Sequence, residues 1–236
     1  MTATGASSVR GARRRQGLVE AAAELIVAEG PAAVTHRAVA ERARASLSAT
    51  TYYFSGLDDL LGAAGSYLVA RWAEQAERVR DEVRETIGRR ETAVPAAEKD
   101  VPAAEKEAAA EKGPAGEKGQ AGEKGSAAEK GPAARKPEPT PELAVSAVLA
   151  ALLPPEGQVR GHYQQLLAAG ATPAVARAYH AGRNRLDAAI GDILAATNSP
   201  CPAALAVAVV DGAVVSALSE GRDVRKTAAD LLRRVV

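Results

Sequence analysis

Cysteine and aromatic residues are scarce in this chain of 236 residues, and their scarcity excludes several classes of protein. The single cysteine, Cys201, rules out an intrachain disulfide framework and a cysteine-rich zinc site. Aromatic residues make up 3% of the chain, whereas hydrophobic residues make up 47%. The core must therefore be aliphatic and rich in alanine, a balance that favours helices over strands. We predict an all-α fold.

Long apolar runs and catalytic motifs are also lacking. No stretch of about 20 apolar residues is free of polar interruption, which disfavours a membrane span. The N-terminal residues lack the apolar segment of a secretory signal, so we expect a soluble, cytoplasmic protein. The three histidines have no spacing that suits a metal, and no Ser-His-Asp set or Gly-rich phosphate loop is visible. We therefore expect no enzyme, no metal site and no cofactor.

The net charge of +1 hides an asymmetry along the chain. Residues 1–54 carry seven arginines and only four acidic side chains. Residues 1–14 are predicted to form a flexible basic arm, which includes Arg10, Arg13 and Arg14. On charge alone, this arm could be a solvated tail or could be attracted to nucleic-acid phosphates.

The N-terminal third predicts three short helices followed by a long one. Apolar residues repeat at helical spacing over 16–29, and Gly30-Pro31 ends this first helix. Thr35 is a good N-cap for the second helix, and Ser46 or Ser48 can cap the third, which runs to about Phe54. A fourth helix of around 30 residues starts at Leu57, with acidic residues in its first turn.

Residues 91–139 differ in character from the rest of the chain. Glu-Lys pairs recur there, with a period of six residues from Glu111, and large apolar side chains are almost lacking. We predict a disordered low-complexity insertion, because little burial can offset the entropy of ordering. The alternative is a structural or interaction protein organised by a collagen-like repeat, since glycine occupies every third position from Gly113 to Gly125.

Helical patterns return after Thr140-Pro141 and predict five more helices, with no strand pattern anywhere. Their expected ranges are 141–153, 159–169, 173–197, about 200–220 and 223–235. Cys201 would lie in the first turn of the fourth of these helices, where the helix dipole could lower the pKa of its thiol. A redox sensor is one interpretation of Cys201, and an inert buried thiol is the other.

Three short helices with a tight turn before the third predict a helix-turn-helix. The stretch from Arg15 to Leu61 resembles the DNA-binding domain of the TetR family of bacterial transcriptional regulators, through the end of its first helix, Thr35 with Val39-Ala40, and TTYYF. The segment VVDGAVVSALSEGRD is similar to the family's last dimerisation helix. The resemblance implies a DNA-binding domain at 15–56 and a ligand-binding and dimerisation domain at 57–236.

The same resemblance implies a homodimeric regulator, expected to be a repressor that a small hydrophobic ligand releases from a palindromic DNA operator. Arg37 matches a position that reads base edges. The full set of implied DNA-contacting residues is Thr35, His36, Arg37, Ser46, Leu47, Ser48, Ala49, Thr51, Tyr52 and Tyr53. The chain departs from the family pattern at Arg44, Thr51, Tyr53 and Leu57, where Gly, Tyr, His and Lys are usual. Tyr52 and Tyr53 are the natural substitutes for the missing phosphate contacts.

A ligand pocket inside the C-terminal helices is implied as well. Its candidate lining residues are the few aromatic or polar groups on apolar helices: Tyr67, Trp72, His162, Tyr163 and Tyr179. The nearly all-apolar helix around Gly212 predicts a close helix–helix crossing, with Ala208 and Ala213 as its small neighbours. We expect this crossing on the two-fold axis of a dimer, paired with the helix after Pro173, although the core of the monomer could also host it.

Overall fold

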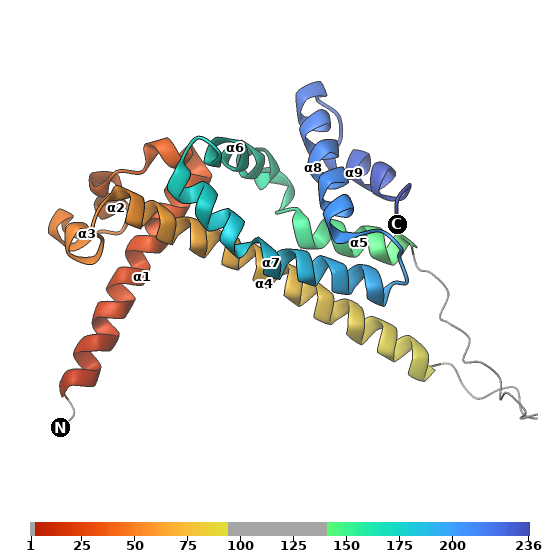
Figure 1. The fold of residues 1–236 in the computed structure, drawn as a ribbon, viewed down its shortest axis with the longest axis horizontal. Coiled ribbons are helices and arrows are strands. Elements are labelled where there is room, and N and C mark those ends of the chain that lie inside the picture. The colour runs from red at the N-terminus through yellow and green to blue at the C-terminus, as the bar shows by residue number, and fades with distance from the viewer. Residues whose placement is uncertain (1–2, 94–140) are drawn as a thin grey trace, which may run out of the picture.

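The computed structural model describes residues 3–93 and 141–236, and this part of the chain contains helices and no strand (Figure 1). The predicted all-α fold is confirmed. The elements in chain order are α1 (Ala3–Glu29), η1 (Pro31–Ala33), α2 (His36–Arg42), α3 (Leu47–Tyr53), α4 (Leu57–Ala93), α5 (Pro141–Leu152), η2 (Glu156–Gln158), α6 (Val159–Ala169), α7 (Pro173–Ala196), α8 (Ala203–Glu220) and α9 (Val224–Leu232).

Side-chain caps fix the starts of the two short helices α2 and α3. The hydroxyl of Thr35 accepts a hydrogen bond from the backbone N–H of Ala38 at 3.1 Å. Ser46, rather than Ser48, caps α3, because its hydroxyl accepts from the N–H of Ala49 at 3.3 Å. Both caps satisfy backbone donors that the first turn of a helix leaves unpaired.

The segment predicted as a flexible basic arm is helical from Ala3 onward, because α1 extends through it without a break. No proline interrupts residues 3–29, and alanine and arginine are both good helix formers. The arginines of this segment therefore lie on the surface of a helix that projects from the body of the protein (Figure 1).

Two hydrophobic cores hold the protein together. The first is formed by α1–α3, the start of α4 and the region where α6 is followed by α7, and it includes Leu18, Ile26, Phe54 and Leu60. Leu60 lies beyond the domain boundary predicted at residue 56, so the start of α4 packs with the helix-turn-helix. The second core joins the distal part of α4 to α5–α9 and includes Ile190 and Val214.

Helices α4 and α7 lie side by side over most of the length of α7 (Figure 1). Two glycines allow this close approach. A Cβ atom at Gly65 would lie 2.9 Å from the Cβ of Ala178, and a Cβ at Gly182 would lie 2.3 Å from Cγ1 of Val69. Arg185 adds a bidentate ion pair to Glu77 at 2.9 Å along the same contact.

Two helix boundaries differ from those expected. Helix α4 continues to Ala93, so residues 91–93 are helical, and the rest of the predicted insertion, with the collagen-like repeat, lies outside the described residues. Helix α8 starts at Ala203 after the N-cap Pro202, so Cys201 precedes the helix instead of lying in its first turn. Cys201 is buried, and burial raises the pKa of its thiol. The predicted basis for a reactive thiolate is therefore wrong.

Helix α8 is the one helix in the described part of the chain that is long and apolar enough to cross a membrane by length and composition. A third of it is buried in the protein, and core helices of globular proteins pass the same test. Ala206, Val210 and Val214 face the second core, where they pack with α5, α7 and α9.

Candidate functional site

The helix-turn-helix presents most of the predicted DNA-contacting residues to solvent. Thr35, Arg37, Ser46, Leu47, Ser48, Thr51 and Tyr52 are exposed, whereas His36, Ala49 and Tyr53 are partly buried. Arg37 has no ion pair or hydrogen-bond partner among the residues that the structure describes. Its guanidinium is therefore available to a ligand outside the protein.

Two large side chains on α3 are unusually exposed. Tyr52 keeps 81% of its surface exposed and Leu47 keeps 54%, although both carry large apolar surfaces. Phe54, by contrast, is in the core as predicted, and the guanidinium of Arg15 lies over its ring at 4.9 Å. Leu47 and Tyr52 therefore add apolar surface to the exposed side of α3.

The polar groups on this surface are held by local hydrogen bonds. The hydroxyls of Ser46 and Ser48 lie 2.9 Å apart, so they form one small polar site at the start of α3. Tyr52 and Tyr53 stack edge to face, with ring centroids 4.9 Å apart. Nδ1 of His36 is buried and has no hydrogen-bond partner, so no hydrogen bond at this nitrogen holds the imidazole in place.

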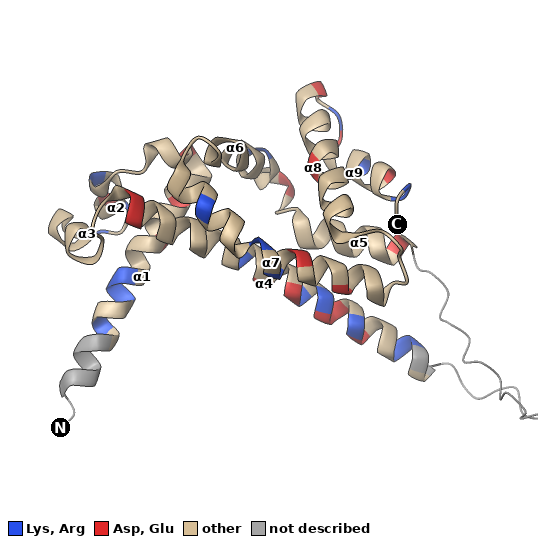
Figure 2. Ribbon diagram, viewed as in Figure 1, with Lys and Arg blue, Asp and Glu red and all other residues tan. Residues whose placement is uncertain are grey.

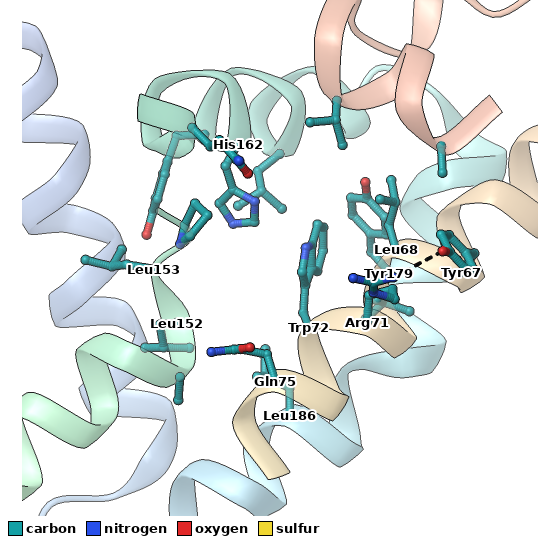
Figure 3. A pocket seen from close by; sticks show the side chains of 18 of the residues that line it. Tyr67, Leu68, Arg71, Trp72, Gln75, Leu152, Leu153, His162, Tyr179 and Leu186 are labelled. Atoms are coloured by element: carbon teal, nitrogen blue, oxygen red, sulfur yellow. Dashed lines mark hydrogen bonds between the residues drawn. The ribbon is translucent and has the colours of Figure 1, made fainter. Parts of the chain in front are cut away.

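A cavity of about 1010 Å³ lies between the helix-turn-helix and the C-terminal helices (Figure 3). All five residues predicted for a ligand pocket line it: Tyr67, Trp72, His162, Tyr163 and Tyr179. They come from α4, α6 and α7, which are far apart in the sequence and are brought together by the fold. On one side the wall is formed by Glu24 and Arg42, which belong to α1 and α2.

Aromatic rings pack against one another on the inner wall of this cavity. The Trp72 ring lies 5.0 Å from that of His162 and 4.9 Å from that of Tyr179, both edge to face. The Tyr179 hydroxyl donates a hydrogen bond to Oε1 of the buried Gln165 at 2.6 Å, which fixes the ring. Burial lowers the pKa of His162 to about 4, so its imidazole is neutral near pH 7.

Asp211 supplies a carboxylate to the wall of the cavity. The Tyr163 hydroxyl donates a hydrogen bond to its Oδ1 at 2.9 Å, and burial raises the pKa of the Asp211 carboxyl. Burial and the nearby Asp211 also raise the pKa of Tyr163, which stays protonated as the donor. Sequence reasoning missed Asp211 as a pocket residue, although it is the one charged residue between Ala203 and Leu218.

Cations at the cavity wall are engaged with neighbouring side chains. Arg71 donates a hydrogen bond to the hydroxyl of Tyr67 at 3.3 Å (Figure 3), and Arg183 forms an ion pair with Asp187 at 2.7 Å. Arg42 forms ion pairs with Glu24 and Glu29, at 3.7 and 3.3 Å. This last contact joins α2 to α1 at the edge of the cavity, so the cavity adjoins the helix-turn-helix directly.

The predicted dimer residues on α8 divide between two faces. Ala208 and Gly212 are exposed, whereas Ala213 is 1% exposed and packs in the core of its own protomer. Ala213 is thus misplaced in the prediction, because one residue along a helix rotates a side chain by about 100°. A Cβ atom at Gly212 would meet nothing within 4 Å, so the crossing expected there is not made inside the monomer.

The exposed face of α8 carries a continuous apolar stripe. Leu205, Ala208, Gly212 and Val215 follow each other at steps of three and four residues, and Leu205 and Val215 keep 45% and 42% of their surface exposed. Helix α7, the expected partner of this stripe, packs its large apolar residues toward the protein and exposes the polar Arg177, Asn184 and Arg185 together with the small Ala181, Ala188 and Ala195. That arrangement disfavours α7 as the partner helix.

No group of three or more His, Cys, Asp or Glu residues that could hold a metal ion occurs within residues 3–93 and 141–236.

Comparisons with known proteins point to one family. Residues 18–64 match the family model described as "Bacterial regulatory proteins, tetR family", and residues 136–236 match "Tetracyclin repressor-like, C-terminal domain". No curated protein sequence matches the chain.

Solved structures that are similar to this chain were also found. One, from Mesorhizobium loti and described as a TetR-family transcriptional regulator, is 12% identical, with 96% of each chain covered and a TM-score of 0.57. The multidrug binding protein EbrR, in complex with imidazole, is 24% identical, with 94% of each chain covered and a TM-score of 0.48. At these identities the comparison with the first structure concerns the fold alone.

Proposed function

The chain belongs to the TetR family of bacterial transcriptional regulators, and on that premise we propose that it is a dimeric repressor, released from a palindromic DNA operator by a small hydrophobic ligand. Proteins of this family are generally DNA-binding regulators without enzymatic activity. The observation that carries the proposal is the cavity of about 1010 Å³, whose wall runs from Asp211 on α8 to Glu24 and Arg42 of the helix-turn-helix.

The DNA contacts would be made by the exposed residues of α2 and α3. Arg37, exposed and without a partner in the described part of the chain, can bond bidentately to O6 and N7 of a guanine. Ser46 and Ser48 would donate to phosphate or base edges, and Tyr52 would pack on the sugar-phosphate backbone. Leu47 can contact only apolar surface, such as a thymine methyl group.

The ligand would bind among the rings of Trp72, Tyr179 and His162. These rings provide a mostly apolar wall, and the partly buried Asp211 provides a hydrogen-bond acceptor that can fix the orientation of a ligand. Because Glu24 and Arg42 line the same cavity, a ligand that fills it would alter the packing of α1 and α2. Release follows if the ligand binds more tightly to the conformation that has low affinity for DNA.

The dimer would form through the apolar stripe on α8. Two copies of Leu205, Ala208, Gly212 and Val215 can pack across a two-fold axis, with Gly212 allowing close approach of the two backbones. A dimer would place the two recognition helices α3 about 34–36 Å apart, the spacing of successive major grooves on one side of the duplex.

The experiment uses the one tryptophan of the chain, Trp72, as a reporter inside the cavity. N-phenylnaphthylamine, an uncharged hydrophobic dye, is added to the full-length protein, and saturable quenching of Trp72 by energy transfer is measured. A duplex selected from a library of random palindromes serves as operator. The expected result is that dye concentrations that quench Trp72 also release the duplex, as followed by fluorescence anisotropy.

Two neighbouring leucines on α6 provide the matched variants. Leu166 lines the cavity, whereas Leu167 is 70% exposed and does not. Leu166→Phe should weaken dye binding by partly filling the cavity, and Leu167→Phe should leave it unchanged. Quenching of Trp72 without release of DNA would contradict the proposed regulation, and failure to select any duplex would contradict the role as a DNA-binding regulator.

A further inference from the structure

A basic hollow of about 580 Å³ lies beside the recognition helix, between the N-terminal part of α1 and the turn that joins α2 to α3. Its wall contains three arginines and no acidic residue. The lining residues are Arg13, Arg14, Gly17, Leu18, Ala43, Arg44, Ala45, Ser46 and Ala49. Figure 2 shows basic residues on this part of α1, which projects beside α3.

The arginines of this hollow have no partner in the protein. Arg13, Arg14 and Arg44 are exposed, and none of them forms an ion pair or hydrogen bond through its side chain within the described part of the chain. Neighbouring arginines behave differently: Arg42 pairs with Glu24 and Glu29, and Arg15 lies over the ring of Phe54. Three unpaired guanidinium groups around one hollow repel each other, so the arrangement favours an anion between them.

Arg44 occupies a backbone conformation that glycine would adopt more easily. Its φ angle is +50°, in the left-handed region, and it follows the end of α2. The N–H of Arg44 donates to the carbonyl of Glu41 at 3.1 Å, and the N–H of Ala45 donates to that of Ala40 at 2.8 Å. These two bonds form the helix end at which glycine is usual. The chain therefore has an arginine at a position where the backbone conformation alone would favour glycine.

We propose that Arg13, Arg14 and Arg44 form a binding site for phosphates of the DNA backbone, next to the bases that α3 contacts. Guanidinium groups bind phosphate oxygens with paired hydrogen bonds, and three of them can neutralise one or two adjacent phosphates. Ser46 and Ala49 connect the hollow to α3, so a phosphate held there lies at the edge of the proposed base-reading surface. This inference rests on the proposed DNA-binding role of α3.

The test measures affinity for a fluorescein-labelled duplex of random sequence at several salt concentrations, which requires no knowledge of the operator. Arg44→Gly should reduce the slope of log K against log salt by about 0.9 for each phosphate that each protomer no longer neutralises. The same substitution should raise the thermal midpoint of unfolding, because glycine relieves the left-handed backbone. A purely structural arginine would give the rise in midpoint without the change in slope.

Three further variants separate charge from backbone effects. Arg44→Ala should reduce the slope without a gain in stability, and Arg44→Lys should keep most of the slope. Arg90→Ala removes a positive charge near the far end of α4, outside the hollow, and should leave the slope unchanged. If the wild type binds DNA and Arg44→Gly keeps the wild-type slope, the proposed phosphate site is wrong, but the proposed role in DNA binding still stands. If the wild type binds no duplex at all, the proposed function fails with it.

Discussion

The helix-turn-helix and the C-terminal helices carry candidate sites that are built in opposite ways. The surface proposed to contact DNA, called the DNA-facing surface below, consists of exposed side chains on two short helices that are close together in sequence, such as Arg37 and Tyr52. The cavity is lined by side chains from α1, α2 and α4–α8, among them Trp72, His162 and Asp211, so helices far apart in the sequence contribute to it. Local structure is enough to expose side chains on a surface, whereas a cavity between helices exists only after those helices have packed. Substitutions should therefore act on DNA binding locally and on the cavity through stability.

The largest effect is expected from a substitution on α8, which lies outside the helix-turn-helix but should still abolish DNA binding. Gly212→Leu places a large side chain on the exposed stripe, and we expect it to split the dimer and eliminate binding to a palindromic operator. Helix content should stay near the wild-type level, because an added Cβ meets nothing within 4 Å in the protomer. Light scattering measures the oligomeric state, and circular dichroism measures the helix content. A dimer with normal operator affinity would place the interface elsewhere.

Acid should destabilise the C-terminal half through His162. Its pKa falls from 6.5 to about 4 on folding because burial disfavours the charged ring, so the unfolded chain binds the proton more readily. Stability is then fully present above about pH 6.5 and decreases toward pH 4, by about 3 kcal/mol in total at about 1.4 kcal/mol per unit.

Urea unfolding at several pH values measures this decrease. His162→Gln should flatten the pH dependence between 6.5 and 4, whereas His180→Gln, at a residue that lines the same cavity but at an exposed position on α7, should retain it. The same pH profile for the two variants would contradict the burial of the His162 ring.

The DNA-facing surface should respond to substitution without any change in stability. Arg37→Ala should cost about 1–3 kcal/mol of affinity at the base pair it contacts, if the contact is bidentate. Because Arg37 is exposed and has no partner within the described residues, the free energy of unfolding and the quenching of Trp72 by dye should be unchanged. A gel-shift titration in which the variant binds operator as tightly as the wild type would remove Arg37 from the surface.

The last prediction compares two helical glycines, Gly182 inside the contact between α4 and α7 and Gly88 outside it. Gly182→Ala should destabilise the protein by about 1–3 kcal/mol, because Val69 is stiff and leaves no space for the new methyl group. Gly88→Ala, on a part of α4 with nothing within 4 Å, should stabilise by up to about 1 kcal/mol through helix propensity. Thermal unfolding measures both, and Val69→Ala should partly rescue Gly182→Ala. Equal effects of the two substitutions would contradict the close contact.

Much of the fold could be predicted because it is encoded by short stretches of sequence. Thr35 and Ser46 cap their helices through hydrogen bonds that span three residues, so their role depends on little else. The ranges of α6 and α7 follow from Gly170 and Thr172-Pro173 in the same way. The N-terminal extent of α1 and the start of α8 were predicted less well, because several residues near each boundary are compatible with either state.

The sequence by itself determined an all-helical protein and the helix-turn-helix, because residue composition and local caps carry that information, whereas the aromatic residues of the pocket were candidates implied by the family resemblance. Only the tertiary structure decided that Asp211 faces the cavity while its neighbour Gly212 faces solvent, and that Ala213 is buried. It also decided that Arg13 and Arg14 of α1 share a hollow with Arg44. Such pairings depend on how helices rotate and cross, which is set by the packing of residues distant in the chain.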